Sequence, residues 1–135
     1  MMQVKELSKR LQYARILFAI AGLIISFYLA SSVLFNTPVS CPGGQVINCD
    51  KVLGSLYSKT FGVSNTFFGI GYFVAVIALH FFKRPLTLAL LSAASMGFVA
   101  YFVYAEYQIG SICLWCTGAH ICALALFLIS MHELR

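Results

Sequence analysis

The sequence predicts an all-α integral membrane protein, built as a bundle of four transmembrane helices. Of its 135 residues, 61% are hydrophobic and only 10% are charged, whereas charged residues make up about 25% of an ordinary soluble domain. The mean hydropathy is +0.90, and the apolar residues fall into four long stretches. A soluble domain of this length has no interior large enough to hide that much apolar surface, so we expect lipid to cover it.

The first predicted span runs from Ile16 to Phe35. At about 1.5 Å for each residue, it is long enough to cross a hydrocarbon core of about 30 Å. A basic start before an apolar run is also typical of a signal peptide. This run, however, is about twice as long as the hydrophobic part of a signal peptide, and the small residues Ala30-Ser31-Ser32 lie inside it rather than after it. We therefore expect it to be retained as a helix.

Three further spans complete the predicted bundle, over residues 65–82, 86–104 and 112–131. Lys83-Arg84-Pro85 separates the second span from the third, because charged residues are costly in lipid and proline cannot continue a helix. The length suits one domain, so we predict a single four-helix membrane domain over residues 1–135.

Lysine and arginine gather on one side of this topology, and such residues mark the cytoplasmic side of a membrane protein. The residues on this side are Lys5, Lys9, Arg10, Arg15, Lys83, Arg84 and Arg135, whereas the loop over residues 36–64 contains only Lys51 and Lys59. We predict a multi-pass protein of the cell membrane, with both termini in the cytoplasm and the 36–64 loop outside. The connection that contains Glu106 should also face outward. The net charge of +5 then reflects topology, and no nucleic-acid partner is expected.

Two segments outside the spans have helical patterns of their own. Residues 1–15 combine apolar residues at helical spacing with Lys and Arg, which predicts an interfacial helix on the inner membrane surface. In the outer loop, an apolar pattern begins after Asn48, a suitable N-cap, and stops at Gly62. We predict a short amphipathic helix there, resting as a lid on the outer face.

Four of the five cysteines are expected on the outer side. Cys41 and Cys49 fall in the outer loop, and Cys113 and Cys116 fall at the outer end of the fourth span. Cys122 lies about two turns deeper. Because disulfides persist outside the cytoplasm, the four outer thiols are available for redox chemistry.

The spacing of these thiols predicts an electron relay. Cys113 and Cys116 form a Cys-x-x-Cys pair at a helix start, where unpaired N–H groups and the helix dipole favour a thiolate, the nucleophile of disulfide exchange. Cys41 and Cys49 flank Pro42-Gly43-Gly44, a hinge able to carry either sulfur towards Cys113. Electrons would enter at the loop pair and leave through the helix pair to a lipid-soluble oxidant.

Other interpretations of the cysteines stay open. The four outer cysteines are able to bind a zinc ion, although the seven-residue spacing and the oxidising side disfavour it. Cys41 and Cys49 alone are also suited to a structural disulfide. Cys122 is most simply a small buried apolar residue.

Polar and aromatic residues near the pair are candidates for binding a ligand. His120 lies one turn below Cys116, and an intramembrane histidine is a functional candidate by default. The Asn65 carboxamide needs a polar partner within a span, and a ligand carbonyl would provide one. Phe68 and Trp115 offer flat apolar faces, for which an interfacial aromatic belt is the alternative explanation.

The ordered pattern of these residues resembles the vitamin K epoxide reductase family and its prokaryotic homologues. The pattern consists of Cys41-x7-Cys49, Ser55, Phe61-Gly62, NTFFG over residues 65–69, and Cys113-x2-Cys116. The resemblance covers nearly the whole chain and implies a four-helix membrane bundle that encloses a quinone near the outer face. The vertebrate enzyme has a tyrosine where this chain has His120, so epoxide reduction is not carried over.

The resemblance also implies a role for each cysteine. Cys116 would face the quinone and Cys113 would exchange with the loop. Cys49 would exchange with Cys113, while Cys41 would face an external partner.

Asn65 matches a carbonyl-binding asparagine of the family, and Ser55 matches a serine near the loop disulfide. The predicted cofactor-binding set is Asn65, His120, Ser55, Phe68 and Trp115. We predict a quinone-dependent thiol-disulfide oxidoreductase that uses a ubiquinone- or menaquinone-type quinone and no metal. It would oxidise a separate thioredoxin-fold carrier and so support disulfide bond formation, as a monomer in contact with membrane lipid. The alternatives are a quinone epoxide reductase that uses partner thiols and a non-catalytic four-cysteine zinc-binding scaffold.

Overall fold

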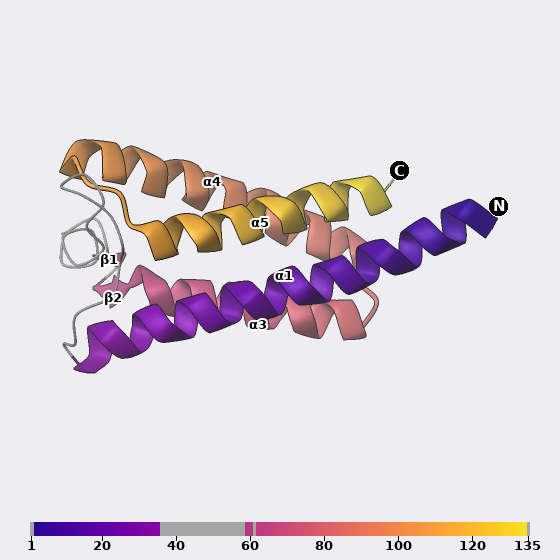
Figure 1. Ribbon diagram of the computed structural model, residues 1–135, viewed down its shortest axis with the longest axis horizontal. Helices are drawn as coiled ribbons and strands as arrows, with labels where there is room; N and C mark the ends of the chain where they lie inside the picture. Colours follow the sequence, from indigo (N-terminus) through magenta and orange to yellow (C-terminus); the bar gives the residue numbers. More distant parts are fainter. Residues whose placement is uncertain (1, 36–58, 61, 135) are drawn as a thin grey trace.

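The computed structural model describes residues 2–35, 59–60 and 62–134. Four helices of this part of the chain lie along the long axis of the molecule (Figure 1). In chain order the elements are α1 (Met2–Phe35), β1 (Lys59–Thr60), β2 (Val63–Ser64), α3 (Asn65–Phe81), α4 (Pro85–Ile109) and α5 (Leu114–Glu133).

The four helices correspond to the four predicted spans. Lys5–Phe35 of α1, together with α4 and α5, is long and apolar enough to cross a membrane. The remaining helix, α3, is equally apolar in character but has 17 residues and so a length of about 25 Å. The prediction of a helical membrane bundle is confirmed, with α3 shorter than its neighbours.

The bundle is apolar outside as well as inside, as expected for a protein in lipid. Leu17, Ile24, Phe27 and Leu128 each expose more than half of their surface. A smaller core lies between the helices, and it consists of Ala19, Phe73, Val76, Leu88, Cys122 and Leu126. Cys122, the cysteine deepest in the predicted spans, therefore lies where a small apolar residue is expected.

Small residues allow α1 and α3 to approach closely. A Cβ atom added at Gly22 of α1 would lie 2.3 Å from the Phe73 ring of α3, and one added at Gly69 of α3 would lie 2.8 Å from the Ser26 hydroxyl. Close packing of this kind holds transmembrane helices together, because the hydrophobic effect does not drive helices to associate when they are surrounded by lipid. It also fixes α3 beside α1, which positions the first residues of α3.

A buried ion pair ties three helices together at one end of the bundle. Arg15 of α1 forms an ion pair with Glu133 of α5, and its guanidinium donates a hydrogen bond to Nδ1 of His80 in α3 at 3.0 Å. Arg15 is 4% exposed. Both chain termini and the 82–84 turn lie at this end (Figure 1), which groups the basic segments as the charge pattern predicts.

The predicted interfacial segment continues directly into the first span. Residues 2–15 belong to α1, which is one continuous helix of 34 residues. Its N-terminal part projects beyond the other helices (Figure 1).

The opposite end of the bundle carries a short hairpin. Strands β1 and β2 pair antiparallel, with Lys59 opposite Ser64 and Thr60 opposite Val63. Gly62 in the turn has φ +79°, a left-handed conformation that favours glycine. The predicted lid helix would have reached Gly62, but Lys59 and Thr60 are extended. The rest of the lid and of the 36–64 loop, up to residue 58, lies outside the described residues.

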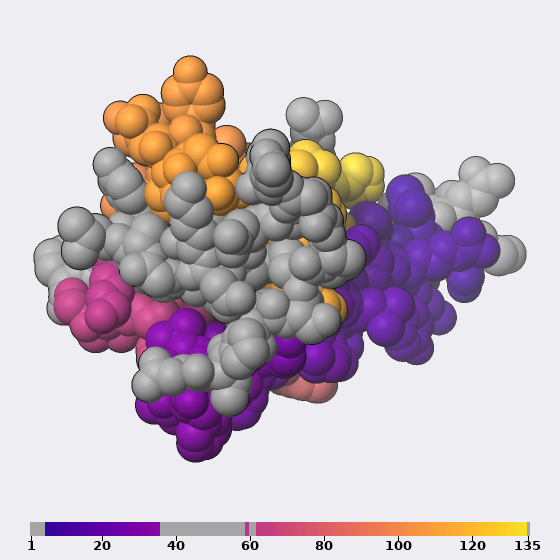
Figure 2. Space-filling model, turned by 60° about the vertical axis from the view of Figure 1, so that its left-hand side comes forward, coloured from indigo at the N-terminus to yellow at the C-terminus, as the bar shows by residue number. Residues whose placement is uncertain are grey.

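The connection between α4 and α5 lies at the same end as the hairpin and the end of α1 (Figure 2). Helix α4 starts with Pro85 at its first turn and ends before Gly110, whose φ is 78° and whose N–H donates to the Glu106 carbonyl at 3.0 Å. The helix therefore extends past the predicted end at residue 104. As a result, Glu106 belongs to the helix and is buried, in contrast to the expectation that it lies in an outward connection.

Candidate active site: a cysteine pair beside an apolar cavity

Helix α5 begins at the Cys-x-x-Cys pair. Cys113 is its N-cap residue, with an extended backbone (φ −90°, ψ 113°), and its sulfur accepts a hydrogen bond from the Cys116 N–H at 3.2 Å. The Cys113 carbonyl accepts bonds from the Thr117 N–H at 3.0 Å and from the Thr117 hydroxyl at 2.8 Å. The thiol thus takes the place of the hydroxyl or carboxylate that usually caps a helix.

This position stabilises a thiolate on Cys113. The hydrogen bond between the two cysteine side chains lowers the pKa of the Cys113 thiol, and backbone N–H groups of Cys116 and Trp115 act in the same direction. Burial and the nearby Glu106 carboxyl oppose them, but the pKa remains below its ordinary value. A thiolate is the reactive form in disulfide exchange, so Cys113 is prepared for that chemistry.

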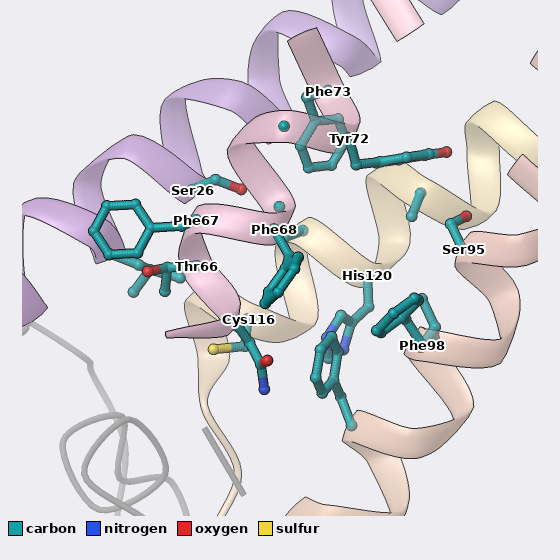
Figure 3. Close-up of a pocket in the computed structure, with 18 of the residues that line it drawn as sticks. Ser26, Thr66, Phe67, Phe68, Tyr72, Phe73, Ser95, Phe98, Cys116 and His120 are labelled. Carbon is teal, nitrogen blue, oxygen red and sulfur yellow. The ribbon is translucent and has the colours of Figure 1, made fainter. Parts of the chain in front are cut away.

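An apolar cavity of about 480 Å³ lies between α1, α3, α4 and α5. This volume falls in the range of small-molecule binding sites, about 300–1,000 Å³. Figure 3 shows Phe68 of α3, Phe98 of α4, and Cys116 and His120 of α5 gathered around it. Most of the lining is apolar, with a few polar groups between.

The two cysteines of the pair have different surroundings. Cys116 lines the cavity, and Figure 3 shows its side chain there. Cys113 is fully buried and packs with Leu29, and Cys113 itself does not line the cavity. The thiols of Cys113, Cys116 and Cys122 are free, with no disulfide among the described residues.

Three of the predicted ligand-binding residues line the cavity with Cys116: Asn65, Phe68 and His120. Asn65 is the first residue of α3 and follows β2 directly. His120 stacks on Phe102 of α4, with ring centroids 5.5 Å apart and an interplanar angle of 12°. The stack fixes the imidazole plane against one wall of the cavity.

Trp115 does not belong to this set. Its indole packs on Tyr28 of α1 with ring centroids 5.3 Å apart, and it contacts the cluster of Leu29 and Cys113. Trp115 is not among the residues that line the cavity. The tryptophan supports the cysteine pair from the side of α1.

The remaining predicted site residues, Cys41, Cys49 and Ser55, lie outside the described residues. Within the part of the chain that the structure describes, no three His, Cys, Asp or Glu side chains gather as a metal site would require.

Glu106 is an ionisable residue of the cavity that sequence reasoning missed. It lines the cavity with Cys116, is 8% exposed, and has one carboxyl oxygen, Oε1, without a hydrogen-bond partner among the described atoms. The available signal was a single carboxyl close to the end of an apolar span, since an ionisable residue inside a membrane marks a functional site by default.

Comparisons with known proteins place the chain in a family. Its sequence matches the model of the vitamin K epoxide reductase family over residues 13–131, which include all four spans, the cavity and every cysteine. A search of curated proteins gives no match. The family groups membrane oxidoreductases whose chemistry links thiols to quinones. The chain belongs to the vitamin K epoxide reductase family.

Proposed function

We propose that this protein is a quinone-dependent membrane thiol oxidoreductase that oxidises a thioredoxin-fold partner and so supports disulfide bond formation. The observation that carries the proposal is the placement of the cysteine pair. Cys116 lines an apolar cavity, whereas Cys113 starts the helix beside it and favours the thiolate form. One sulfur is thus directed to a lipid-soluble oxidant, and the other is prepared for exchange with a thiol.

The cavity residues fit a quinone. A quinone head group is a flat apolar ring with two carbonyl acceptors, and the cavity offers aromatic walls from Phe68 and Phe98. Asn65 and His120, which also line the cavity, carry N–H groups able to donate to a carbonyl oxygen. When bound, a quinone supplies the capacity to accept two electrons. Phe68, Asn65 and His120 would hold the ring in place.

In the proposed relay, electrons reach the cavity through successive exchanges of disulfide bonds. A reduced partner attacks the Cys41–Cys49 disulfide, and the Cys49 thiolate then attacks Cys113 of a Cys113–Cys116 disulfide. This exchange forms a Cys49–Cys113 disulfide, breaks the bond within the pair and releases Cys116 as a thiolate beside the cavity. The second thiol of the partner then attacks the partner–Cys41 disulfide and leaves as part of the oxidised partner. The freed Cys41 thiolate attacks Cys49, which restores the loop disulfide and leaves Cys113 and Cys116 reduced. Asn65 and His120 would stabilise negative charge at a carbonyl oxygen there.

The direction of the relay depends on reduction potentials. For a two-electron couple, about 30 mV corresponds to about 1.4 kcal/mol. Even a modest difference between the reduction potentials of the thiols and the quinone therefore makes oxidation of the partner favourable. We place the reaction at the outer face of the cell membrane, with both termini in the cytoplasm, because the termini and the basic 82–84 turn lie at the opposite end of the bundle from the cysteine pair.

The test is quinone reduction by purified protein in bicelles, with ubiquinone-1 or menadione as oxidant and a reduced thioredoxin-fold protein as electron donor. Cys116→Ala should abolish turnover, whereas Cys122→Ala should retain it, because Cys122 lies in the helix core. Full turnover by Cys116→Ala would contradict the proposal.

A second candidate is reduction of a quinone epoxide by partner thiols, which the description of the matching family favours. Parallel assays with vitamin K epoxide and with vitamin K quinone separate the two. Turnover of the epoxide alone would favour this candidate over thiol oxidation by quinone.

A further inference from the structure

The Glu106 carboxyl has no evident structural function. It lies in the last turn of α4 and is 8% exposed. It forms no ion pair with a described residue, and Oε1 has no hydrogen-bond partner among the described atoms. Glu133, which is partly buried, is paired with Arg15 near the opposite end of the helices. A structural carboxyl would be expected to have such a partner.

Burying an unpaired carboxyl is unfavourable. A polar group without a hydrogen bond loses free energy on transfer from water, and an isolated carboxylate loses far more, so such a group binds a proton instead. A neutral carboxylic acid beside a cavity is able to donate that proton to an acceptor and later to recover it. Proton transfer would therefore give the Glu106 carboxyl a chemical role, although it has no ion-pair partner among the described residues.

Glu106 is also close enough to the cysteine pair to affect it. It lines the same cavity as Cys116, and ionisation of this carboxyl would oppose a thiolate on Cys113. The carboxyl, the sulfurs and the cavity therefore share one electrostatic environment.

The proposed reaction requires protons as well as electrons. Oxidation of the Cys113/Cys116 dithiol breaks two S–H bonds, forms one S–S bond, and releases two electrons and two protons. Reduction of a quinone to its quinol takes up the same numbers. Electrons can pass between a sulfur and a bound ring directly, but a proton reaches an oxygen in an apolar cavity only from a polar side chain or along a path to water.

We propose that Glu106 carries one of these protons, donating it to a quinone carbonyl oxygen in the cavity. This inference rests on the proposed function. Glu106 then regains a proton from those that the thiols release, so its state is unchanged over the cycle. The second proton reaches the other quinone oxygen from the outer aqueous side. The electrons come from the cysteine pair, which ends as a disulfide.

The first measurement is single-turnover oxidation of pre-reduced protein by ubiquinone-1. Glu106→Gln keeps the size of the side chain but cannot donate a proton, so the rate should fall on the order of 100-fold. The ubiquinone-1 concentration that gives half the maximal rate should change little. Glu106→Asp should recover much of the loss, because it restores the acid. The matched control is Glu6→Gln, at an exposed position of α1, which should behave as the wild type.

The second measurement does not depend on turnover. Ubiquinone-1 is added to the oxidised protein, where no electrons can flow, and the carboxylic-acid C=O stretch is recorded by infrared difference spectroscopy. A band that shifts on binding should appear in the wild type and in Glu6→Gln and be missing in Glu106→Gln. The same band in Glu106→Gln would overturn the inference.

The outcomes separate this inference from the proposed function. Wild-type protein that ubiquinone-1 does not oxidise would overturn both. Wild-type oxidation together with an equal rate in Glu106→Gln would overturn the role of Glu106 alone. A slow Glu106→Gln that Glu106→Asp does not rescue, without the infrared difference, would indicate a structural defect and would also overturn it.

Discussion

The Cys116 backbone N–H donates a hydrogen bond to the Cys113 sulfur at 3.2 Å, so the first cysteine of the pair is also the N-cap of α5. One interaction therefore determines where the helix begins, which sulfur favours the thiolate, and which sulfur is left to face the cavity. The helix start and the redox pair cannot be changed independently.

Replacing Cys116 should raise the pKa of Cys113. The side-chain hydrogen bond from Cys116 is the largest influence that lowers this pKa, and Cys116→Ala removes it while the backbone hydrogen bonds remain. At a fixed pH near neutrality, a smaller fraction of Cys113 will then be thiolate. Mass spectrometry of the Cys113 peptide, after alkylation across a pH series, should show the midpoint displaced to higher pH. Cys122→Ala is the control, and an equal midpoint in Cys116→Ala and wild type would contradict this account.

Gly22→Ala should destabilise the bundle. The new methyl group would clash with the ring of Phe73, which is 2% exposed. Overpacking of this kind typically costs about 1–3 kcal/mol. Thermal unfolding in detergent, followed by circular dichroism, should give a lower midpoint.

The matched control is Gly97→Ala in α4, where an added Cβ meets nothing within 4 Å. Alanine is favoured over glycine in a helix, so this variant should be as stable as the wild type or more stable. Equal losses in the two variants would show that the close approach of α1 and α3 is not the cause.

Breaking the Arg15–Glu133 ion pair from one side should destabilise the protein more than removing both partners. Glu133→Leu leaves the buried Arg15 charge without its partner, and this typically costs about 3–5 kcal/mol. The double variant Arg15→Leu/Glu133→Leu removes both charges and should recover much of that loss. The free energies of unfolding of Arg15→Leu, Glu133→Leu and the double variant in detergent measure the coupling energy between the two side chains. Additive losses would mean that the pair does not act as a unit.

Filling the cavity should block the quinone without affecting thiol exchange. Ala119 lines the cavity, so Ala119→Phe should lower quinone-dependent oxidation while reduction of the cysteine pair by a soluble dithiol continues. The control is Ala100→Phe, at an exposed position of α4 that does not line the cavity. If both variants kept the wild-type quinone activity, the cavity would not be the binding site.

The helices were predictable from sequence because apolar length alone identifies a span. The predicted second span, 65–82, differs by one residue from α3, which ends at Phe81. The end of α4 was harder to predict, because Glu106 interrupts the apolar pattern while the helix continues to the left-handed Gly110. The charged residue Glu106 thus predicted a connection between helices at a place where the backbone is still helical.

The site was only partly predictable, because a cavity forms between helices and leaves no local pattern. Asn65 and His120 attract attention in the sequence as polar residues within apolar spans, and both line the cavity with Cys116; their role in binding a ligand stays a prediction. Trp115 follows the same helix start but packs on Tyr28 of α1, outside the cavity lining. Glu106 required the helix packing to be known before its burial was evident.

The most direct test of the relay is to map the disulfides of the reduced protein before and after ubiquinone-1 is added. Mass spectrometry should find Cys113 and Cys116 as free thiols at first and joined to each other afterwards, with Cys122 free throughout. A Cys113/Cys116 pair that stays reduced while ubiquinone-1 is consumed would contradict the account.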